Sequence, residues 1–298
     1  MSSRKTTLHS ALLTSTDRNG AVDLSSLSHS IEFVVAAGVD GICVNGATGE
    51  YCRWGTKDRK TITETAHSTL NGRGLLLVGI GAVTIDESIE LGRHALDHGA
   101  DKLLLPPPHY FRYSVEDIAE FYRQVAEALD GEILIYNLPV FTNPVETALT
   151  AQLVSEIPNV VGMKDSSGSL DALTALRKQG AEVRWMGNDG KIAEALKLGL
   201  ANGAISGVAG VFPEVVGRLF EAHRNGADLT EADSALQEIV NRINQLPTPW
   251  ALKVFAASRG LGSSDYASAV STERRSELAD LRDWYESWAE KHSLLTVA

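Results

Sequence analysis

The segment Val160-Val161-Gly162-Met163-Lys164 decides the fold class, because it is apolar at every position before its lysine. A strand that does not alternate apolar with polar residues is buried on both faces, which is typical of a parallel sheet covered by helices. Similar short runs recur along the chain at Ala11–Thr14, Gly41–Asn45, Leu75–Gly79, Lys102–Pro106, Ile133–Asn137, Val183–Gly187 and Gly203–Gly207. Their spacing of roughly 20 to 35 residues leaves room for a loop and a helix after each strand.

Helix-like segments fill the intervals between these runs, and several of them stop at a glycine, which tolerates the left-handed conformation in which many helices end. They are Leu27–Ala37 before Gly38, Asp86–Asp97 before Gly99, Val115–Leu129 before Gly131 and Lys191–Leu198 before Gly199. Ser114 is the expected N-cap of the third, with Asp117 in its first turn. Eight consecutive strand–helix units predict an α/β protein with a (β/α)8 TIM barrel, and a doubly wound sheet is the alternative.

The chain continues well beyond the eighth strand. We expect residues 1–212 to form the (β/α)8 barrel through strand eight, and residues 213–298 to form the last barrel helix and a C-terminal helical extension. The helices predicted in this second part are Glu231–Gln245, Pro249–Arg259 and Thr272–His292.

Composition and charge restrict the classes of partner. The 298-residue chain is 44% hydrophobic and 22% charged, which is typical of a globular protein with a sizeable core. Its formal net charge of −11 argues against nucleic acid and against an anionic membrane as partners, although a local positive site can still hold a small anion. No apolar run reaches the roughly 18 residues that cross a bilayer, and the first residues do not lead into the long apolar region of a signal peptide.

The two cysteines, Cys43 and Cys52, are too few for a disulfide framework or for a four-ligand zinc site. The sequence shows neither a metal-ligand cluster nor a phosphate loop that ends in Gly-Lys-Ser/Thr. We therefore expect a reduced, soluble, cytoplasmic protein without a metal and without a cofactor.

The carboxyl ends of the predicted strands point to Lys164 as the reactive residue, since active sites of (β/α)8 barrels lie at these ends. Lys164 closes the apolar run that starts at Val160, where the barrel interior would hold it. Burial disfavours the charged ammonium, and a neutral amine can attack a ketone to form an imine. The alternative is a lysine that caps its strand and points into solvent.

Two neighbouring features fit such chemistry. Tyr136 ends the preceding strand, so its phenol would approach Lys164 across the barrel mouth and could transfer a proton; the alternative is an amphipathic tyrosine at the edge of the core. The loop Gly46-Ala47-Thr48-Gly49-Glu50 offers exposed N–H groups and the Thr48 hydroxyl, which suit a carboxylate, although glycine-rich turns are common after strands.

Several motifs occur together, in one order and at consistent spacing. They are Gly46-Ala47-Thr48-Gly49-Glu50, Pro108-His109-Tyr110, Tyr136-Asn137-Leu138-Pro139, Gly162-Met163-Lys164-Asp165, Gly187-Asn188-Asp189 and Gly203-Ala204-Ile205-Ser206. With them the sequence resembles the dihydrodipicolinate synthase / N-acetylneuraminate lyase family of Schiff-base class I aldolases. The resemblance covers about residue 8 to residue 215, and the helical tail more loosely.

The resemblance implies a role for each motif. Lys164 would be the Schiff-base lysine and Tyr136 the proton-transfer tyrosine, while Thr48 and the backbone amides beside it would hold the carboxylate of a pyruvate moiety. Tyr110 would project across a subunit interface, since family members are usually tetramers built from dimers. The other residues implied at the substrate are Gly49 in the carboxylate loop, the backbone carbonyl of Ile205 in the pyruvate pocket, and Gly187, Asp189 and Ser206 or Gly207 at the variable end.

The sequence departs from the family pattern at two positions. Members that make dihydrodipicolinate carry an arginine shortly after Tyr-Asn-x-Pro, where Phe141 stands here, so a bidentate carboxylate clamp is lost. Members that act on sugar acids typically carry an apolar residue there, so Phe141 favours the 2-keto-3-deoxy sugar acid aldolase branch. Ala47 replaces a threonine or serine that relays a proton between two tyrosines, so either a water or the substrate must supply that path.

The function expected from the resemblance is that of a pyruvate-dependent aldolase or lyase. It would cleave or form a carbon–carbon bond in a 2-oxo acid, with pyruvate and an aldehyde as partners and a homotetramer as the assembly. A dehydratase or hydratase-aldolase of the same family is one alternative, and 4-hydroxy-tetrahydrodipicolinate synthase, disfavoured by Phe141, is another. A non-catalytic barrel that binds a metabolite is the alternative from a different class, and Ala47 is its only support.

Overall fold

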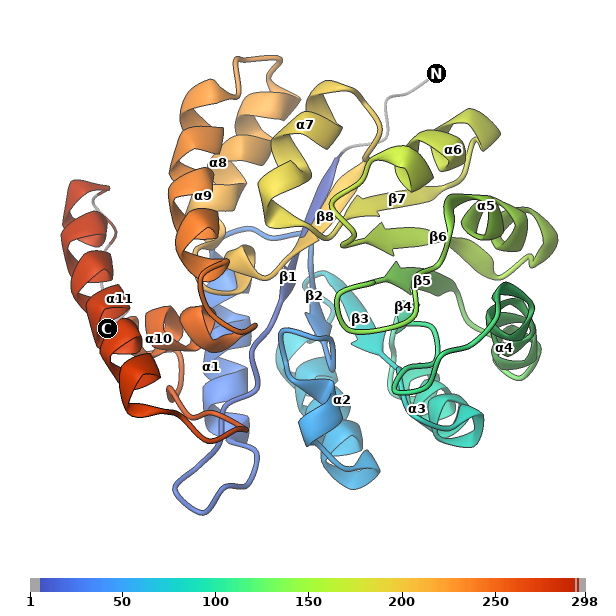
Figure 1. Cartoon of the computed structure of the whole chain (residues 1–298), viewed down its shortest axis with the longest axis horizontal. Coiled ribbons are helices and arrows are strands. Elements are labelled where there is room, and N and C mark those ends of the chain that lie inside the picture. Colours follow the sequence, from blue (N-terminus) through green and yellow to red (C-terminus); the bar gives the residue numbers. More distant parts are fainter. Residues whose placement is uncertain (1–5, 293, 295–298) are drawn as a thin grey trace.

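The computed structural model of the chain describes residues 6–292 and residue 294. Eight parallel strands follow one another in sequence order around a closed barrel, and the last strand pairs back with the first. Figure 1 shows these strands surrounded by helices, so the predicted (β/α)8 TIM barrel is confirmed. The strands are β1 Thr7–Ala11, β2 Gly41–Val44, β3 Leu75–Gly79, β4 Lys102–Leu105, β5 Ile133–Asn137, β6 Val160–Asp165, β7 Val183–Met186 and β8 Gly203–Ser206.

One helix follows each strand. The eight are α1 Leu24–Ala36, α2 Thr56–Leu70, α3 Ile85–Asp97, α4 Val115–Glu127, α5 Thr147–Glu156, α6 Asp171–Gln179, α7 Ile192–Lys197 and α8 Pro213–Arg224. The expected cap of α4 is confirmed, because Ser114 Oγ accepts a hydrogen bond from the backbone N–H of Asp117 at 3.1 Å. The Asp117 carboxylate accepts the backbone N–H of Ser114 at 3.0 Å, so the two residues form a capping box.

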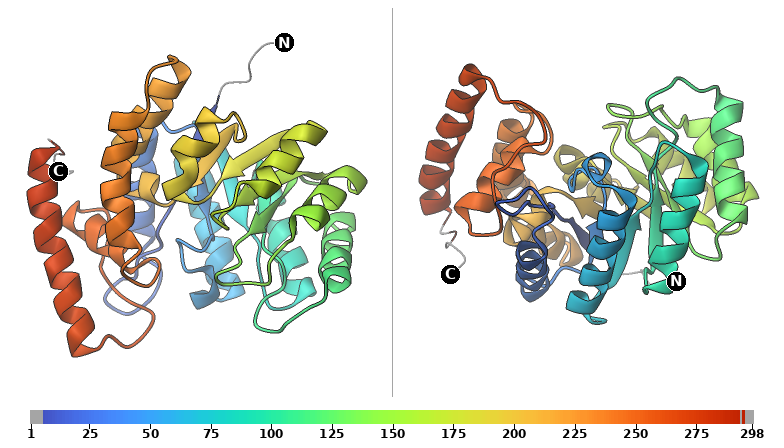
Figure 2. Two further views of the ribbon diagram at one scale, coloured as in Figure 1. Left: turned by 45° about the horizontal axis from the view of Figure 1, so that its top comes forward. Right: turned by 90° about the horizontal axis from the view of Figure 1, so that it is seen from below.

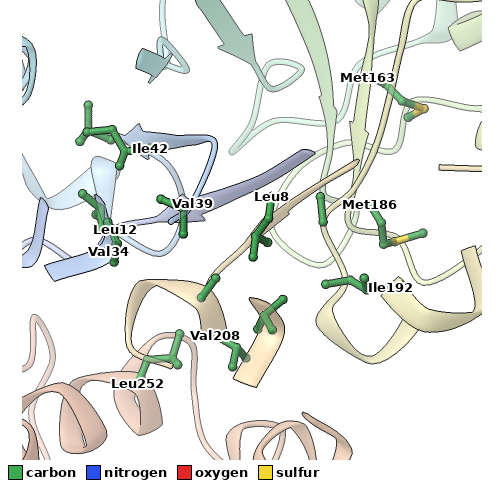
Figure 3. Packing of buried hydrophobic residues seen from close by; sticks show 14 of the residues in the cluster. Leu8, Leu12, Val34, Val39, Ile42, Met163, Met186, Ile192, Val208 and Leu252 are labelled. Atoms are coloured by element: carbon green, nitrogen blue, oxygen red, sulfur yellow. The ribbon is translucent and has the colours of Figure 1, made fainter. Parts of the chain in front are cut away.

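The strands are apolar on both faces, but their side chains still alternate between two separate cores. Leu77, Leu104 and Leu134 point into the barrel and belong to one buried cluster there. The residues that flank them in sequence point outward and pack on the helices. Figure 3 shows part of this outer layer, in which Met186 of β7 lies beside Ile192 of α7. Side-chain parity along each strand therefore determines which residues reach the barrel interior.

The first strand lies four residues earlier than predicted, at Thr7–Ala11 rather than Ala11–Thr14. His9 and Ser10 interrupt the apolar run in sequence, yet both are fully buried. The His9 ring packs against Trp185 at 4.4 Å between centroids, and burial lowers the pKa of His9 to about 4, so the imidazole is neutral near pH 7. Ser10 Oγ donates a hydrogen bond to the Ala209 carbonyl oxygen at 2.9 Å. Contacts with residues distant in sequence thus hold both side chains inside the fold.

Three further helices form the predicted extension: α9 Thr230–Ile243, α10 Trp250–Ser258 and α11 Thr272–Lys291. In both views of Figure 2, α11 lies along the flank of the molecule beside α10. Aromatic rings hold it there: Phe212 before α8 contacts Phe255 of α10 and both Tyr285 and Trp288 of α11 at 5.4 to 5.8 Å between centroids. No helix in the described part of the chain is both long enough and apolar enough to cross a bilayer.

Candidate active site

Lys164 and Tyr136 lie side by side inside the barrel. They are register partners on β6 and β5, and both are buried. The Lys164 Nζ atom lies over the Tyr136 ring, 4.2 Å from its centroid. Among the described residues, no carboxylate forms an ion pair with this amine and no acceptor takes a hydrogen bond from it. The alternative of a solvent-facing lysine is therefore wrong.

An irregularity in β6 turns Lys164 inward. The register against β5 shifts between Ile133 and Leu134, so that Val160 pairs with Ile133 while Gly162 already pairs with Leu134. One extra residue on β6 reverses the parity of everything that follows it, as β-bulges do. Without the shift, Met163 would point into the barrel and Lys164 would point out. Gly162 is required at this point because a Cβ there would overlap the Val183 carbonyl oxygen.

The residues next in sequence, Asn137 and Asp165, form a supporting pair on the outer side of the same strands. Asn137 Nδ2 donates to Asp165 Oδ1 at 3.1 Å, and Asn137 Oδ1 accepts the backbone N–H of Val145 at 3.1 Å. Asp165 Oδ1 also accepts the backbone N–H of Ser167 at 3.0 Å, and burial raises the pKa of this carboxyl. These bonds fix the strand ends that carry Tyr136 and Lys164.

A cavity of about 280 Å³ opens above the lysine. It is smaller than most drug-sized pockets and matches a small metabolite. Eight of the residues predicted at the substrate line it: Ala47, Thr48, Tyr136, Phe141, Lys164, Gly187, Asp189 and Gly207. Three others do not line it: Ile205 and Ser206 are buried on β8, and Gly49 lies within the loop, where its carbonyl oxygen accepts the Trp54 indole N–H at 3.0 Å.

Asp189 is the acidic group of the cavity. Its Oδ1 accepts a short hydrogen bond from Ser206 Oγ, which in turn accepts the backbone N–H of Ala209 at 2.9 Å. Burial raises the pKa of Asp189, and the hydrogen bond from Ser206 and the nearby Lys164 charge act in the opposite direction. Ser206 therefore orients Asp189 toward the cavity and does not itself line it.

The loop that carries Thr48 is anchored to the C-terminal extension. Glu50, in a left-handed conformation at φ 51°, forms an ion pair with the buried Lys253 of α10. Lys253 Nζ also donates to the Asp265 carbonyl oxygen at 2.8 Å, and Arg53 NH1 donates to Asp265 Oδ2 at 2.6 Å. Buried charges of this kind hold one geometry because any other would leave an unpaired ion. The extension thus fixes the position of the loop that carries Thr48.

Comparison with known proteins agrees with this geometry. Residues 4–281 match the dihydrodipicolinate synthetase family model. The chain belongs to this family. Family membership confirms the predicted resemblance and the prediction of an enzyme, a carbon–carbon lyase.

Relatives from two branches of the family are similar to the chain. YjhH of Escherichia coli, named a probable 2-dehydro-3-deoxy-D-pentonate aldolase, is 29% identical, over 79% of this chain and 78% of its own. The 4-hydroxy-tetrahydrodipicolinate synthase of Pelobacter propionicus is 31% identical, over 82% of this chain and 85% of its own. The crystal structure of Escherichia coli YagE in complex with pyruvate superposes with a TM-score of 0.87 at 27% identity, covering 95% of this chain and 98% of that one.

Tyr110 stands apart from the lysine in this family member. It is 85% exposed, has a φ of 78° and does not line the cavity. Its loop is nevertheless well fixed, because Asn143 Nδ2 donates to the carbonyl oxygens of Pro108 and Phe111 at 2.6 and 2.8 Å. Phe141 lies at the cavity rim and is half exposed. A role for Tyr110 at an interface is therefore a proposal about the assembled protein.

The sequence did not reveal the wall that the extension contributes to the cavity. This wall consists of Val240, Ile243, Asn244, Thr248 and Leu252, from α9, α10 and the segment between them. Ser166, two residues after Lys164, and Asn188, inside the Gly187-Asn188-Asp189 motif, also line the cavity. The sequence signal for these two residues was their position after strands six and seven. The wall from α9 and α10 had no such signal, because the packing of these helices on the barrel mouth follows from no local motif.

Proposed function

We propose that the chain is a pyruvate-dependent class I aldolase, a lyase that acts on a 2-keto-3-deoxy sugar acid through an imine on Lys164. The observation that carries this proposal is the buried pair of Lys164 and Tyr136 at the base of a small cavity. A buried amine without an ion-pair partner is suited to act as a nucleophile toward a ketone. The pyruvate bound in YagE and the aldolase name of YjhH support the same chemistry.

The proposed reaction passes through an imine and an enamine on Lys164. The Lys164 amine adds to the C2 ketone of the 2-oxo acid, and loss of water leaves a protonated imine. The imine accepts the electron pair of the C3–C4 bond as that bond breaks, which yields an enamine and an aldehyde. The proton leaves the C4 hydroxyl through Tyr136 and is returned to C3 of the enamine. Hydrolysis of the imine then releases pyruvate and restores the amine.

The charges around the cavity support a sugar acid as the substrate. Lys164 is the only cationic side chain among the described residues that line it. The adjacent cavity of about 540 Å³ contains Arg53, but that guanidinium is paired with Asp265. A polyhydroxylated tail would instead find the side chains of Asn188, Asp189 and Asn244. Among the described residues that line this cavity, a second carboxylate, as on aspartate semialdehyde, would find no cation beyond the amine that forms the imine.

We also propose that the exposed aromatic residues beside the site lie at a subunit contact of a homotetramer. Tyr110, Phe111 and Phe141 are each more than half exposed, and Tyr110 and Phe111 pack edge to face at 4.8 Å between centroids. A cluster of large apolar side chains on one face is characteristic of an interaction surface. In such an assembly Tyr110 would reach the site of a second copy.

The substrate assignment predicts a clear preference in a panel of acids. We expect kcat/KM for cleavage of 2-keto-3-deoxy pentonate or hexonate to exceed kcat/KM for condensation with aspartate semialdehyde by about 100-fold, the value of one charge-assisted clamp. Pyruvate release and pyruvate consumption measure the two reactions. Phe141→Arg is expected to lower this ratio of kcat/KM values, because it places a guanidinium where a second carboxylate could bind. A preference for aspartate semialdehyde would contradict the assignment, and a keto acid product without pyruvate would indicate the dehydratase alternative.

The close packing around the lysine predicts a strong effect of Gly187→Ala. A Cβ at this position would lie 2.6 Å from Lys164 Cε and would also overlap Ser166 Oγ, so the lysine must move. Displacement of a reacting atom by about 1 Å lowers the rate about 100-fold, and we expect a loss of that size in kcat. Gly190→Ala is the matched control, because its Cβ would meet no atom closer than 3.4 Å. Equal rates for the two variants would contradict the geometry.

A further inference from the structure

Glu64, His94 and His98 form a compact group on the outer wall of the barrel. Glu64 lies on α2, His94 in the last turn of α3, and His98 directly after α3. One ligand atom from each lies within 4.8 Å of the others. The sequence analysis did not identify this group as a possible metal-ligand cluster. The four-residue spacing of the two histidines was the available signal, and Glu64 joins them only through helix packing.

The distances suit a tetrahedral zinc ion. His94 Nε2 lies 2.9 Å and His98 Nε2 lies 4.0 Å from Glu64 Oε1. Zinc–ligand bonds of about 2.0 to 2.1 Å at tetrahedral angles place neighbouring ligand atoms about 3.3 Å apart, between the two observed distances. The two imidazole rings are stacked at 4.1 Å between centroids and 23° between planes, so their in-plane Nε2 lone pairs lie in nearly parallel planes. A rotation of the half-exposed His98 side chain out of this stack would direct both Nε2 atoms to one ion beside Glu64.

The ring of His98 is prepared for ligation by its second nitrogen. His98 Nδ1 lies 2.8 Å from the His94 carbonyl oxygen, which can only accept a hydrogen bond. Nδ1 must therefore carry the proton, and in the neutral ring the lone pair of Nε2 is left on the side of Glu64. Histidines that bind metals are commonly oriented by this hydrogen bond to a carbonyl or carboxylate.

Glu64 is held by a regular series of contacts between the two helices. Thr56 Oγ1 donates to Glu87 at 2.7 Å, and one turn later Lys60 Nζ donates to Glu90 at 2.5 Å. The contact of Glu64 with His94 is the next in this series. Because the first two contacts set the register of α2 against α3, the carboxylate reaches the histidines without a change in the backbone.

We propose that Glu64, His94 and His98 bind one Zn²⁺ ion, with solvent as the fourth ligand, and that the ion links α2 to α3. Two imidazoles and one carboxylate are a common zinc ligand set, whereas Mg²⁺ and Ca²⁺ favour oxygen ligands alone. The negative end of the α3 dipole and the net charge of −11 both attract a cation to this position. The site lies where α3 ends, on the barrel face opposite the strand ends that carry Lys164, so its role is structural and independent of the proposed reaction.

Calorimetric titration of the untagged, EDTA-treated full chain with ZnCl2 tests this site. We expect saturable binding of one equivalent per chain and a rise in Tm that EDTA reverses. His98→Ala and Glu64→Gln, both at accessible positions, are each expected to weaken binding at least about tenfold and to abolish the rise in Tm. His29→Ala removes an exposed histidine on α1 and should leave both unchanged. The absence of saturable binding, or binding that neither ligand variant weakens, would show that the group is only an ion pair.

Discussion

Replacement of Lys164 by alanine is expected to abolish the adduct that borohydride traps when the protein is incubated with pyruvate. The wild-type chain should gain the mass of one reduced pyruvate imine, located on Lys164 by peptide mass spectrometry. Because the imine is the electron sink for breaking the C3–C4 bond, the rate of pyruvate release should fall on the order of 10⁴-fold or more, as for loss of a covalent nucleophile. No other side chain of the cavity can form an imine, since Lys164 is its only amine among the described residues.

Two further variants separate chemistry from folding. Lys164→Met keeps an unbranched apolar stem in the space that the lysine fills, and it should be as inactive as Lys164→Ala. Lys191→Ala removes an exposed lysine that follows β7 and pairs with Glu194, and it should retain both adduct and activity. An adduct that persists in Lys164→Ala, or no adduct in the wild-type chain, would contradict the imine mechanism.

Most of the barrel could be predicted because its strands are buried on both faces and therefore apolar. The exception, β1, shows the limit of that rule. The buried polar residues His9 and Ser10 look like a strand end in sequence, although the His9 ring packs against Trp185 and Ser10 donates a hydrogen bond to the Ala209 carbonyl oxygen, both distant in sequence. The start of α1 was likewise placed three residues late, because its cap depends on Asp23 accepting the backbone N–H of Ser26 at 3.0 Å. Such partners cannot be read from hydrophobic pattern.

The part of the site that lies at the strand ends could be predicted from the sequence. Lys164, Tyr136 and Gly187 end apolar runs, and strand ends converge at one face of a barrel. The parity that turns Lys164 inward was not predictable, because it depends on a register shift that only the paired strands reveal. The role of Lys253 was not predictable either. In sequence it is an ordinary helix lysine, but in the structure it is the buried counter-ion of Glu50.

The C-terminal extension is therefore part of the site as well as an addition to the fold. Its α9 and α10 helices contribute one wall of the cavity, and its Lys253 and Asp265 hold the loop that carries Thr48. For the proposed 2-oxo acid, with its pyruvate moiety at Lys164, this wall forms part of the surface around the remaining substrate atoms. Variation in the extension would then change the accepted aldehyde and leave the imine chemistry intact.

Replacement of Tyr136 by phenylalanine is expected to separate imine formation from bond cleavage. Phenylalanine keeps the aromatic ring beneath the Lys164 amine, which lies 4.2 Å from the centroid of the Tyr136 ring. The substitution removes only the hydroxyl. Without a group to carry the proton from the C4 hydroxyl to C3, kcat should fall about 10²- to 10⁴-fold, the usual contribution of general acid–base catalysis. The borohydride adduct with pyruvate should still form on Lys164 at long incubation.

Tyr122→Phe is the matched control, because Tyr122 is also buried and its hydroxyl donates to the Leu105 carbonyl oxygen at 2.9 Å, outside the cavity. That variant should lose about 1 kcal/mol of unfolding free energy and keep its kcat. If Tyr136→Phe released pyruvate as fast as the wild-type chain, the proton would have to leave by another route. In that case the substrate's own hydroxyls or a water beside Ala47 would carry it, and the tyrosine would serve only to pack against the lysine.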